Sequence, residues 1–154
     1  MVRTTARSRR LRAHALLLVS ALSTGCVLPA PTSGAFESKA AQSAASAVSD
    51  ARTALLAAAL AVGDRSFGSL ISVQLAESAT GAASTAGTFA SIQPPDAASD
   101  RLRAQVLPLL QRAADLIARM RIAARRGDVQ ALRELRGPLA PVADALDRFA
   151  EAHG

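Results

Sequence analysis

The stretch from Asp128 to Glu151, DVQALRELRGPLAPVADALDRFAE, decides the fold class of this chain. Its apolar residues follow one another at steps of three or four, which is the spacing of one face of an α-helix. The residues at these steps are Val129, Leu132, Leu135, Leu139, Val142, Leu146 and Phe149. Gly137-Pro138 lies inside the run, but the apolar phase is the same on both sides of it. We expect one kinked, continuous helix in preference to the alternative, two helices in different directions.

Three earlier segments show the same periodicity and have helix-ending residues between them. Gly63-Asp64 ends the first segment, Pro94-Pro95 forces an extended connection before the third, and Gly127 ends the third. Asp96 or Ser99 can cap the third helix, and Asp128 can cap the fourth. The predicted helices cover about residues 37–62, 67–91, 98–126 and 128–151. A break near Gly81 and a bend at Pro108 are the expected irregularities.

The composition agrees with an all-α fold. The chain has no Trp or Tyr and only four Phe, so its core must consist of aliphatic residues and alanine. Alanine has the highest helix propensity and lets helices approach closely. No run of β-branched residues alternates with polar ones. Four helices of similar length with three short connections predict an up-down-up-down four-helix bundle over residues 36–154.

The N-terminal segment has the organisation of an export signal. Five arginines precede a short apolar run from Ala13 to Leu22. Ten helical residues extend about 15 Å, half of a hydrocarbon core of about 30 Å, so the run is too short for a stable transmembrane helix. Cys26, the only cysteine of the chain, follows directly and cannot form an internal disulfide.

The segment Leu22-Ser23-Thr24-Gly25-Cys26 resembles the lipobox of bacterial lipoproteins. The resemblance implies a diacylglyceryl group on Cys26 and cleavage between Gly25 and Cys26. Residues 1–25 are then the signal peptide, and residues 26–35, with Pro29 and Pro31, are a short flexible tether. Ser23 departs from the aliphatic residue or alanine that the family prefers there.

Two other fates of the N-terminus stay open. An ordinary signal peptidase cutting near Ala30 or Ala35 would release a soluble protein, and an uncut signal would act as an anchor. Ser8-Arg9-Arg10 is compatible with twin-arginine export as well as the general secretory route, although Arg12 stands where the former favours an aromatic residue.

Two segments of the domain, Ser46–Thr53 and Arg119–Asp128, are similar to small, uncharacterised actinobacterial lipoproteins with a helical domain. This resemblance implies a place on the outer face of the plasma membrane. It implies no known activity.

The apparent basicity of the chain comes mostly from the signal. The whole chain has 18 basic and 12 acidic residues, but five basic ones precede Cys26, which leaves 13 against 12. The densest basic group is Arg119, Arg121, Arg125 and Arg126. Without aromatic residues to stack on bases it does not indicate nucleic-acid binding; a solvated helix end or contact with anionic lipid head groups are the two interpretations.

Residues for catalysis are scarce after the signal. The only histidine there is His153, at a position expected to fray, so metal sites built on His and Cys, haem attachment and Ser or Cys triads are not expected. We predict no catalytic, cofactor or metal site.

The acidic residues that we considered are explained by surface ion pairs, by solvation or by partial burial. Asp115 with Arg112 and Arg119, and Asp144 with Arg148, stand three or four residues apart, as in surface ion pairs. Asp50 lies in a small, apolar stretch, where it is either solvated or a partly buried partner for an arginine of another helix.

The sequence thus predicts a lipoprotein, held in the membrane by acyl chains on Cys26, that presents a helical bundle as a structural or protein-interaction module without enzymatic activity. The partner, an envelope protein, is not identified. The alternative is a binding module that holds an apolar or lipid ligand within or between its alanine-rich helices.

Overall fold

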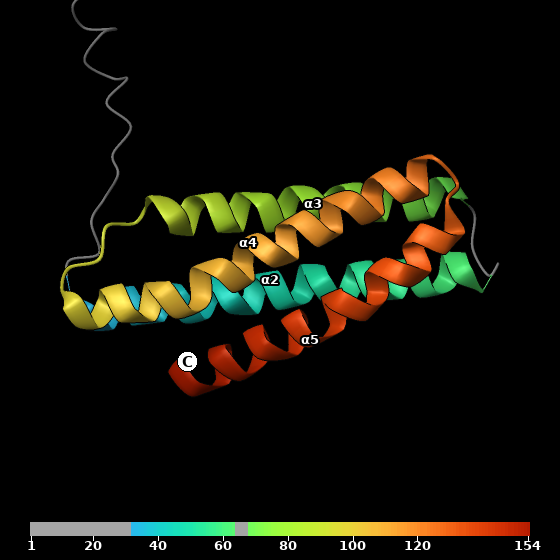
Figure 1. The fold of residues 1–154 in the computed structure, drawn as a ribbon. Helices are drawn as coiled ribbons and strands as arrows, with labels where there is room; N and C mark the ends of the chain where they lie inside the picture. The colour runs from blue at the N-terminus through green and yellow to red at the C-terminus, as the bar shows by residue number, and fades with distance from the viewer. Residues whose placement is uncertain (1–31, 64–67) are drawn as a thin grey trace, which may run out of the picture.

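The computed structural model describes residues 32–63 and 68–154, and these ranges contain four α-helices and no strand. Consecutive helices run in opposite directions and pack against each other (Figure 1). The prediction of an all-α four-helix bundle is confirmed. The helices are α2 (Ser33–Val62), α3 (Gly68–Ser91), α4 (Ala97–Arg125) and α5 (Val129–His153).

Helices α2 and α4 lie at the centre of the bundle. Each of them contacts the other three helices, whereas α3 and α5 do not contact each other. Toward its C-terminus α5 diverges from α4 and follows α2 instead (Figure 1). The residues before Ser33 therefore lead directly into a helix on which the other three pack.

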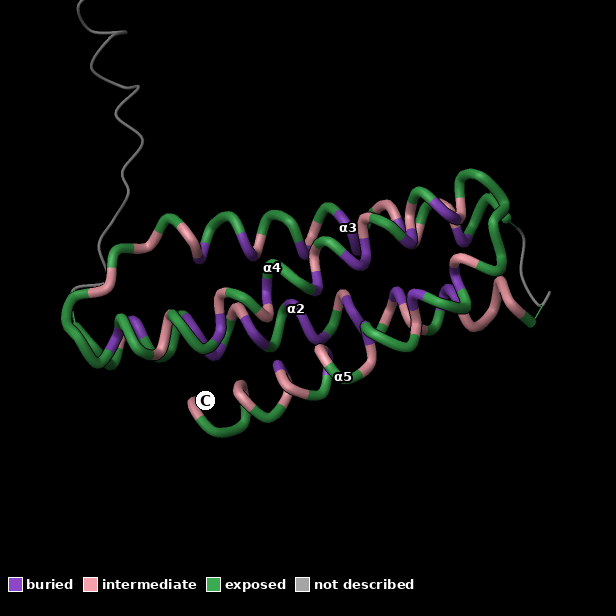
Figure 2. Tube along the Cα trace, in the orientation of Figure 1, coloured by how far each residue is buried: buried purple, intermediate pink, exposed green. Residues whose placement is uncertain are grey.

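The core is built from small residues on α2 and larger ones on its neighbours. Eight of the ten buried residues of α2 are alanine, and they face Leu, Ile, Val, Met and Phe side chains from the other helices. Figure 2 shows the buried positions as stripes along the facing sides of the helices. Phe36 and Phe89 are both fully buried, with ring centroids 5.5 Å apart, and close the core near the start of α2. The small alanine side chains of α2 let its three neighbours approach it closely.

Helix α2 begins at Ser33, within the segment expected to be a tether and four residues before the expected start at Glu37. Thr32 is its N-cap, and the Thr32 hydroxyl accepts a hydrogen bond of 3.1 Å from the backbone N–H of Ala35. Because Phe36 is fully buried, the turn before it is anchored to the core.

The connection between α4 and α5 is a Schellman turn. Gly127 has a φ of +68°, which a glycine adopts without strain. The backbone N–H groups of Gly127 and Asp128 donate to the carbonyl oxygens of Ala124 and Ala123, at 3.0 and 2.9 Å. The Asp128 side chain then caps α5 by accepting from the Ala131 N–H at 2.9 Å. Gly127 and Asp128 thus act as the sequence predicts.

The suspected interruptions do not divide the helices. Helix α5 is continuous across Pro138 and Pro141, α4 is continuous across Pro108, and α3 is continuous through Gly81. The unchanged apolar phase on both sides of Gly137-Pro138 explains the first case, because a break would have exposed Leu139 or Leu146, both fully buried.

Helix α2 also has the length and composition of a membrane span: one 18-residue window within it has a mean hydropathy of 1.3. This is weak evidence, because a core helix of a soluble bundle passes the same criteria. One third of this window is buried against the other helices of the bundle.

Candidate functional site

The predicted lipidation site, Cys26, and the predicted cleavage site between Gly25 and Cys26 lie outside the described residues. The first described residue, Thr32, follows Cys26 by six positions. In the chain, Cys26 is therefore joined to the bundle through the first turn of α2.

That first turn is tied to the start of α4. The Ser33 hydroxyl donates a hydrogen bond to the Asp96 carboxylate, and Asp96 accepts a second one, of 2.8 Å, from the backbone N–H of Ser99 as the N-cap of α4. The hydrogen bond from Ser33, followed by those from Ser99, lowers the pKa of Asp96 to about 2. Asp96 thus caps one helix and binds the beginning of another.

The same end of α2 also holds the C-terminus of α5. His153, expected to be frayed, is the last residue of α5. Its Nδ1 atom lies 2.7 Å from Oε1 of Glu37, and its ring packs on Phe149 with centroids 4.5 Å apart. The expectation of fraying is wrong, because a stacking partner and a carboxylate on α2 fix this side chain. The sequence could not indicate this contact, since 116 positions separate the partners.

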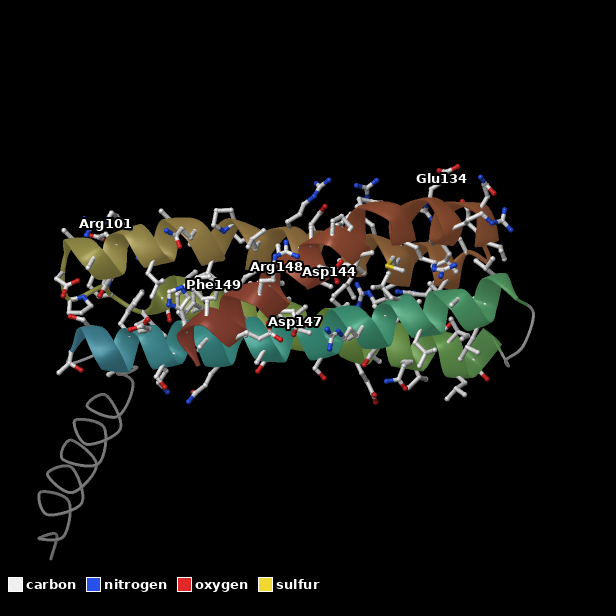
Figure 3. The ribbon with its side chains drawn as sticks, turned by 90° about the horizontal axis from the view of Figure 1, so that it is seen from below. Arg101, Glu134, Asp144, Asp147, Arg148 and Phe149 are labelled. Carbon is white, nitrogen blue, oxygen red and sulfur yellow. The ribbon has the colours of Figure 1, made fainter. Side chains whose placement is uncertain are left out.

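A third tie joins the middle of α2 to α5. Nη2 of Arg52 donates to Oδ2 of Asp147 at 2.5 Å, and Figure 3 shows Asp147 on the part of α5 that overlies α2. Nothing in the sequence indicated this pair, because 95 positions separate Arg52 from Asp147 and no spacing within one helix relates them.

The pairs expected within helices are partly present. Asp115 lies 4.0 Å from both Arg112 and Arg119, at the limit of an ion pair. In the described part of the chain, Asp144 and Arg148 are not within ion-pair distance of each other. Figure 3 shows both on the same turn of α5 as Asp147.

Asp50 is partly buried, as one of the two interpretations had it, but it has no arginine partner in the described residues. Its carboxylate lies against the backbone of α3 at Gly81, where an added Cβ atom would come within 2.7 Å of Oδ2. No arginine lies within ion-pair distance of it among residues 32–63 and 68–154. Burial raises the pKa of Asp50 above its usual value. Gly81, predicted as a weak point of the helix, is instead the position that makes room for this carboxylate.

The predicted arginine-rich region borders a groove between the second half of α4 and the first half of α5. The groove has a volume of about 350 Å³. Arg112, Arg119 and Arg126 form its α4 side, Asp128 and Glu134 contribute carboxylates from the α5 side, and apolar residues lie between. The apolar lining residues are Leu116, Ile122, Ala123, Ala131, Leu135 and Pro138. Of the four arginines singled out in the sequence, Arg119 and Arg126 line this groove.

A second groove, of about 300 Å³, lies between α2 and α3 and is almost entirely apolar. It is lined by Thr53, Leu56, Ala57, Leu60, Leu70, Ile71 and Gln74. Leu56 and Leu70 are more than half exposed. This is the pair of alanine-rich helices between which the sequence suggested an apolar ligand.

Across the described ranges, no group of three or more His, Cys, Asp or Glu side chains is placed to hold a metal ion. Besides the ties between helices and these two grooves, the described residues form a further groove of about 430 Å³ between the start of α2 and the end of α5. In comparisons with protein-family models, curated proteins and solved structures, nothing matches this chain.

Proposed function

We propose that this protein is a membrane-anchored lipoprotein of the cell envelope whose helical bundle serves as a structural or protein-interaction module, without catalytic activity. The observation that carries the proposal is the position of Cys26. It follows an arginine-rich and then apolar segment, and stands six residues before the cap of the first bundle helix. Such spacing suits a folded domain held close to a lipid surface.

The anchoring is physically sufficient. Each buried CH₂ group contributes about 0.8 kcal/mol, and two acyl chains give stable attachment where one is marginal. From Cys26 to Thr32 an extended chain spans at most about 20 Å, at about 3.3–3.6 Å per residue. The Thr32 end of the bundle would therefore lie near the membrane surface.

Fatty-acid labelling tests the anchor. Cells producing the full chain are supplied with a labelled fatty acid, and wild type is compared with Cys26→Ser and with Ser23→Ala as a matched control. We expect label in the membrane fraction for wild type and Ser23→Ala only. Equal labelling of the Cys26→Ser variant would reject lipidation at this residue. A mature N-terminus beyond Ala30, read by mass spectrometry, would reject it independently.

The α2–α3 groove supports a second candidate, a module that binds an apolar or lipid ligand. Its lining is almost free of polar surface, as pockets for apolar ligands are. Native mass spectrometry of the purified protein tests this role. A co-purified lipid that is lost in Leu56→Gln but kept in Ile122→Gln would favour it. A ligand-free wild-type protein would count against it.

A further inference from the structure

The charge of the described residues is unevenly distributed along the bundle. Between Gln111 and Gly137, around the α4–α5 turn, seven arginines stand with three carboxylates. The rest of the described chain has five basic and eight acidic side chains. The arginine-rich region lies at the end of the bundle opposite Thr32 (Figure 1). In the proposed anchored orientation, this end is the farther one from the attachment point.

The groove at this end has an ordered row of cations. Arg112, Arg119 and Arg126 are spaced seven residues apart, which is about two helical turns or 10 Å along α4. Arg112 and Arg119 have only Asp115 near them, at 4.0 Å, and Arg126 has no carboxylate within ion-pair distance in the described residues. The row is therefore available to carboxylates from outside the chain.

Beside this row the groove offers apolar contact. Leu116 and Leu135 are buried beneath it, while Ile122 is 43% exposed. An elongated ligand with an apolar edge and a row of negative charges would cover Ile122 and meet the arginines together. Amphipathic helices bind grooves in this way, with anchors at helical spacing.

A membrane surface fits the groove less well than a helix does. Leu116 and Leu135 are recessed between two helices, and a bilayer is flat on this scale. Asp128 and Glu134 on the α5 side would face the same anionic lipids that the arginines attract. A helix can present carboxylates to α4 and neutral or basic residues to α5, which a uniformly anionic surface cannot.

We infer that the α4–α5 groove docks an amphipathic helix of an envelope protein that carries acidic residues about seven positions apart. This inference rests on the proposed role as an interaction module and names the surface and the partner chemistry for it. Arg119 and Arg126 pair with the acidic residues of that helix, and Ile122 contacts its apolar edge.

Site-specific photo-crosslinking in intact cells tests the inference. The full chain is produced in its host with a photo-reactive amino acid at position 122, in the groove, or at position 73 as a control. Val73 on α3 is exposed to a similar degree as Ile122, at 54%, but does not line the groove. We expect a crosslink from position 122 to an acidic helical segment, identified by mass spectrometry, and not from position 73.

Charge reversal tests the arginines in the same cells. Arg119→Glu with Arg126→Glu should lower the crosslink yield about tenfold, since like charges then face each other across the interface. Arg101→Glu with Arg148→Glu changes the net charge equally but lies outside the groove, and should leave the yield unchanged. Replacing the acidic residues of the captured segment by lysine should restore crosslinking to the reversed groove. Circular dichroism of each variant confirms that the bundle is folded.

Three outcomes would overturn the inference: crosslinks from position 122 to lipid, a captured segment without acidic residues, or a yield that the groove reversal does not change. Failure of the proposed function looks different. If Cys26→Ser remains membrane-bound and labelled, the anchor is wrong whatever the groove binds. If the anchor is confirmed and position 73 crosslinks a protein where position 122 does not, the role as an interaction module is supported. Only the assignment of the α4–α5 groove as its docking surface is then wrong.

Discussion

The carboxylate of Asp50 on α2 occupies the space that a side chain at position 81 of α3 would fill. Oδ2 of Asp50 lies 2.7 Å from the position of a Cβ atom on Gly81, closer than real Cβ contacts come. Packing against Asp50 therefore explains why a glycine stands in the middle of this helix. Its low helix propensity costs about 1 kcal/mol of stability relative to alanine.

A double-mutant cycle tests this relationship. In the Asp50→Ala background, Gly81→Ala should raise the free energy of unfolding by about 1 kcal/mol, because the helix propensity is gained without a clash. In the wild-type background the same change should give no gain or a loss, because the carboxylate must move. Equal effects of Gly81→Ala in both backgrounds, measured by urea unfolding, would contradict the contact.

The same carboxylate predicts a pH dependence. Burial raises the pKa of Asp50 in the folded state, so the folded protein holds the proton more tightly than the unfolded one. The stability that this proton contributes is present in full below the unfolded pKa and is lost as the pH rises through the folded pKa. At pH 7, Asp50→Asn should therefore be more stable than wild type. Thermal unfolding at pH 3 and pH 7 measures whether this advantage shrinks in acid, as we expect.

The contribution of Asp96 to stability has the opposite pH dependence. Its pKa is lowered to about 2, so its contribution is present above the unfolded pKa and is lost as the pH falls through about 2. Asp96→Ser keeps a capping oxygen for the Ser99 N–H but removes the charge that accepts from Ser33. Compared with wild type, Asp96→Ser should lose less stability between pH 4 and pH 2. If both proteins lost the same stability between pH 4 and pH 2, Asp96 would not be responsible for the acid sensitivity.

The pair between Arg52 and Asp147 should contribute little but measurable stability. Their side chains are 59% and 34% exposed, and ion pairs of this kind contribute about 0.2–1 kcal/mol. Arg52→Gln and Asp147→Asn, alone and together, should give a coupling energy in this range that falls at about 1 M salt, where the screening length is about 3 Å. A coupling energy of zero at low salt would mean that the contact does not persist in solution.

The alanine face of α2 should tolerate no larger residue. Ala51 is fully buried, whereas Ala45 on the same helix is exposed. Ala51→Leu should cost about 1–3 kcal/mol, because it separates helices that pack on alanine, and Ala45→Leu should be nearly neutral. Urea unfolding of both variants measures the difference. Similar costs at the two positions would indicate that the bundle is loosely packed.

The repeating patterns of the sequence predicted the bundle well. Leu132, Leu139 and Leu146 are all buried, as their spacing on one face requires, and Gly127 ends α4 in the left-handed conformation expected of a helix-stopping glycine. These features depend on neighbours within a few residues, and such local constraints are visible in a single chain.

The contacts between distant parts of the chain were not predictable in this way. Asp147 was overlooked because its partner, Arg52, is 95 residues away, and the hydrogen bond from Ser33 to Asp96 likewise joins residues 63 positions apart. For the same reason Gly81 was predicted to be a weak point, although the carboxylate that requires it lies on another helix. The grooves likewise depend on how two helices pack, which periodicity does not specify.

The position of α2 has a mechanical consequence. Tension applied to the chain before Thr32 would enter the bundle through α2, a helix that contacts all three others. The first turn of that helix is tied to α4 through Asp96 and, one turn on, to α5 through Glu37 and His153. A pulling force along the axis of α2 would therefore load its contacts with three neighbours together. A domain connected in this way resists unfolding by a force applied to the chain at its N-terminal end.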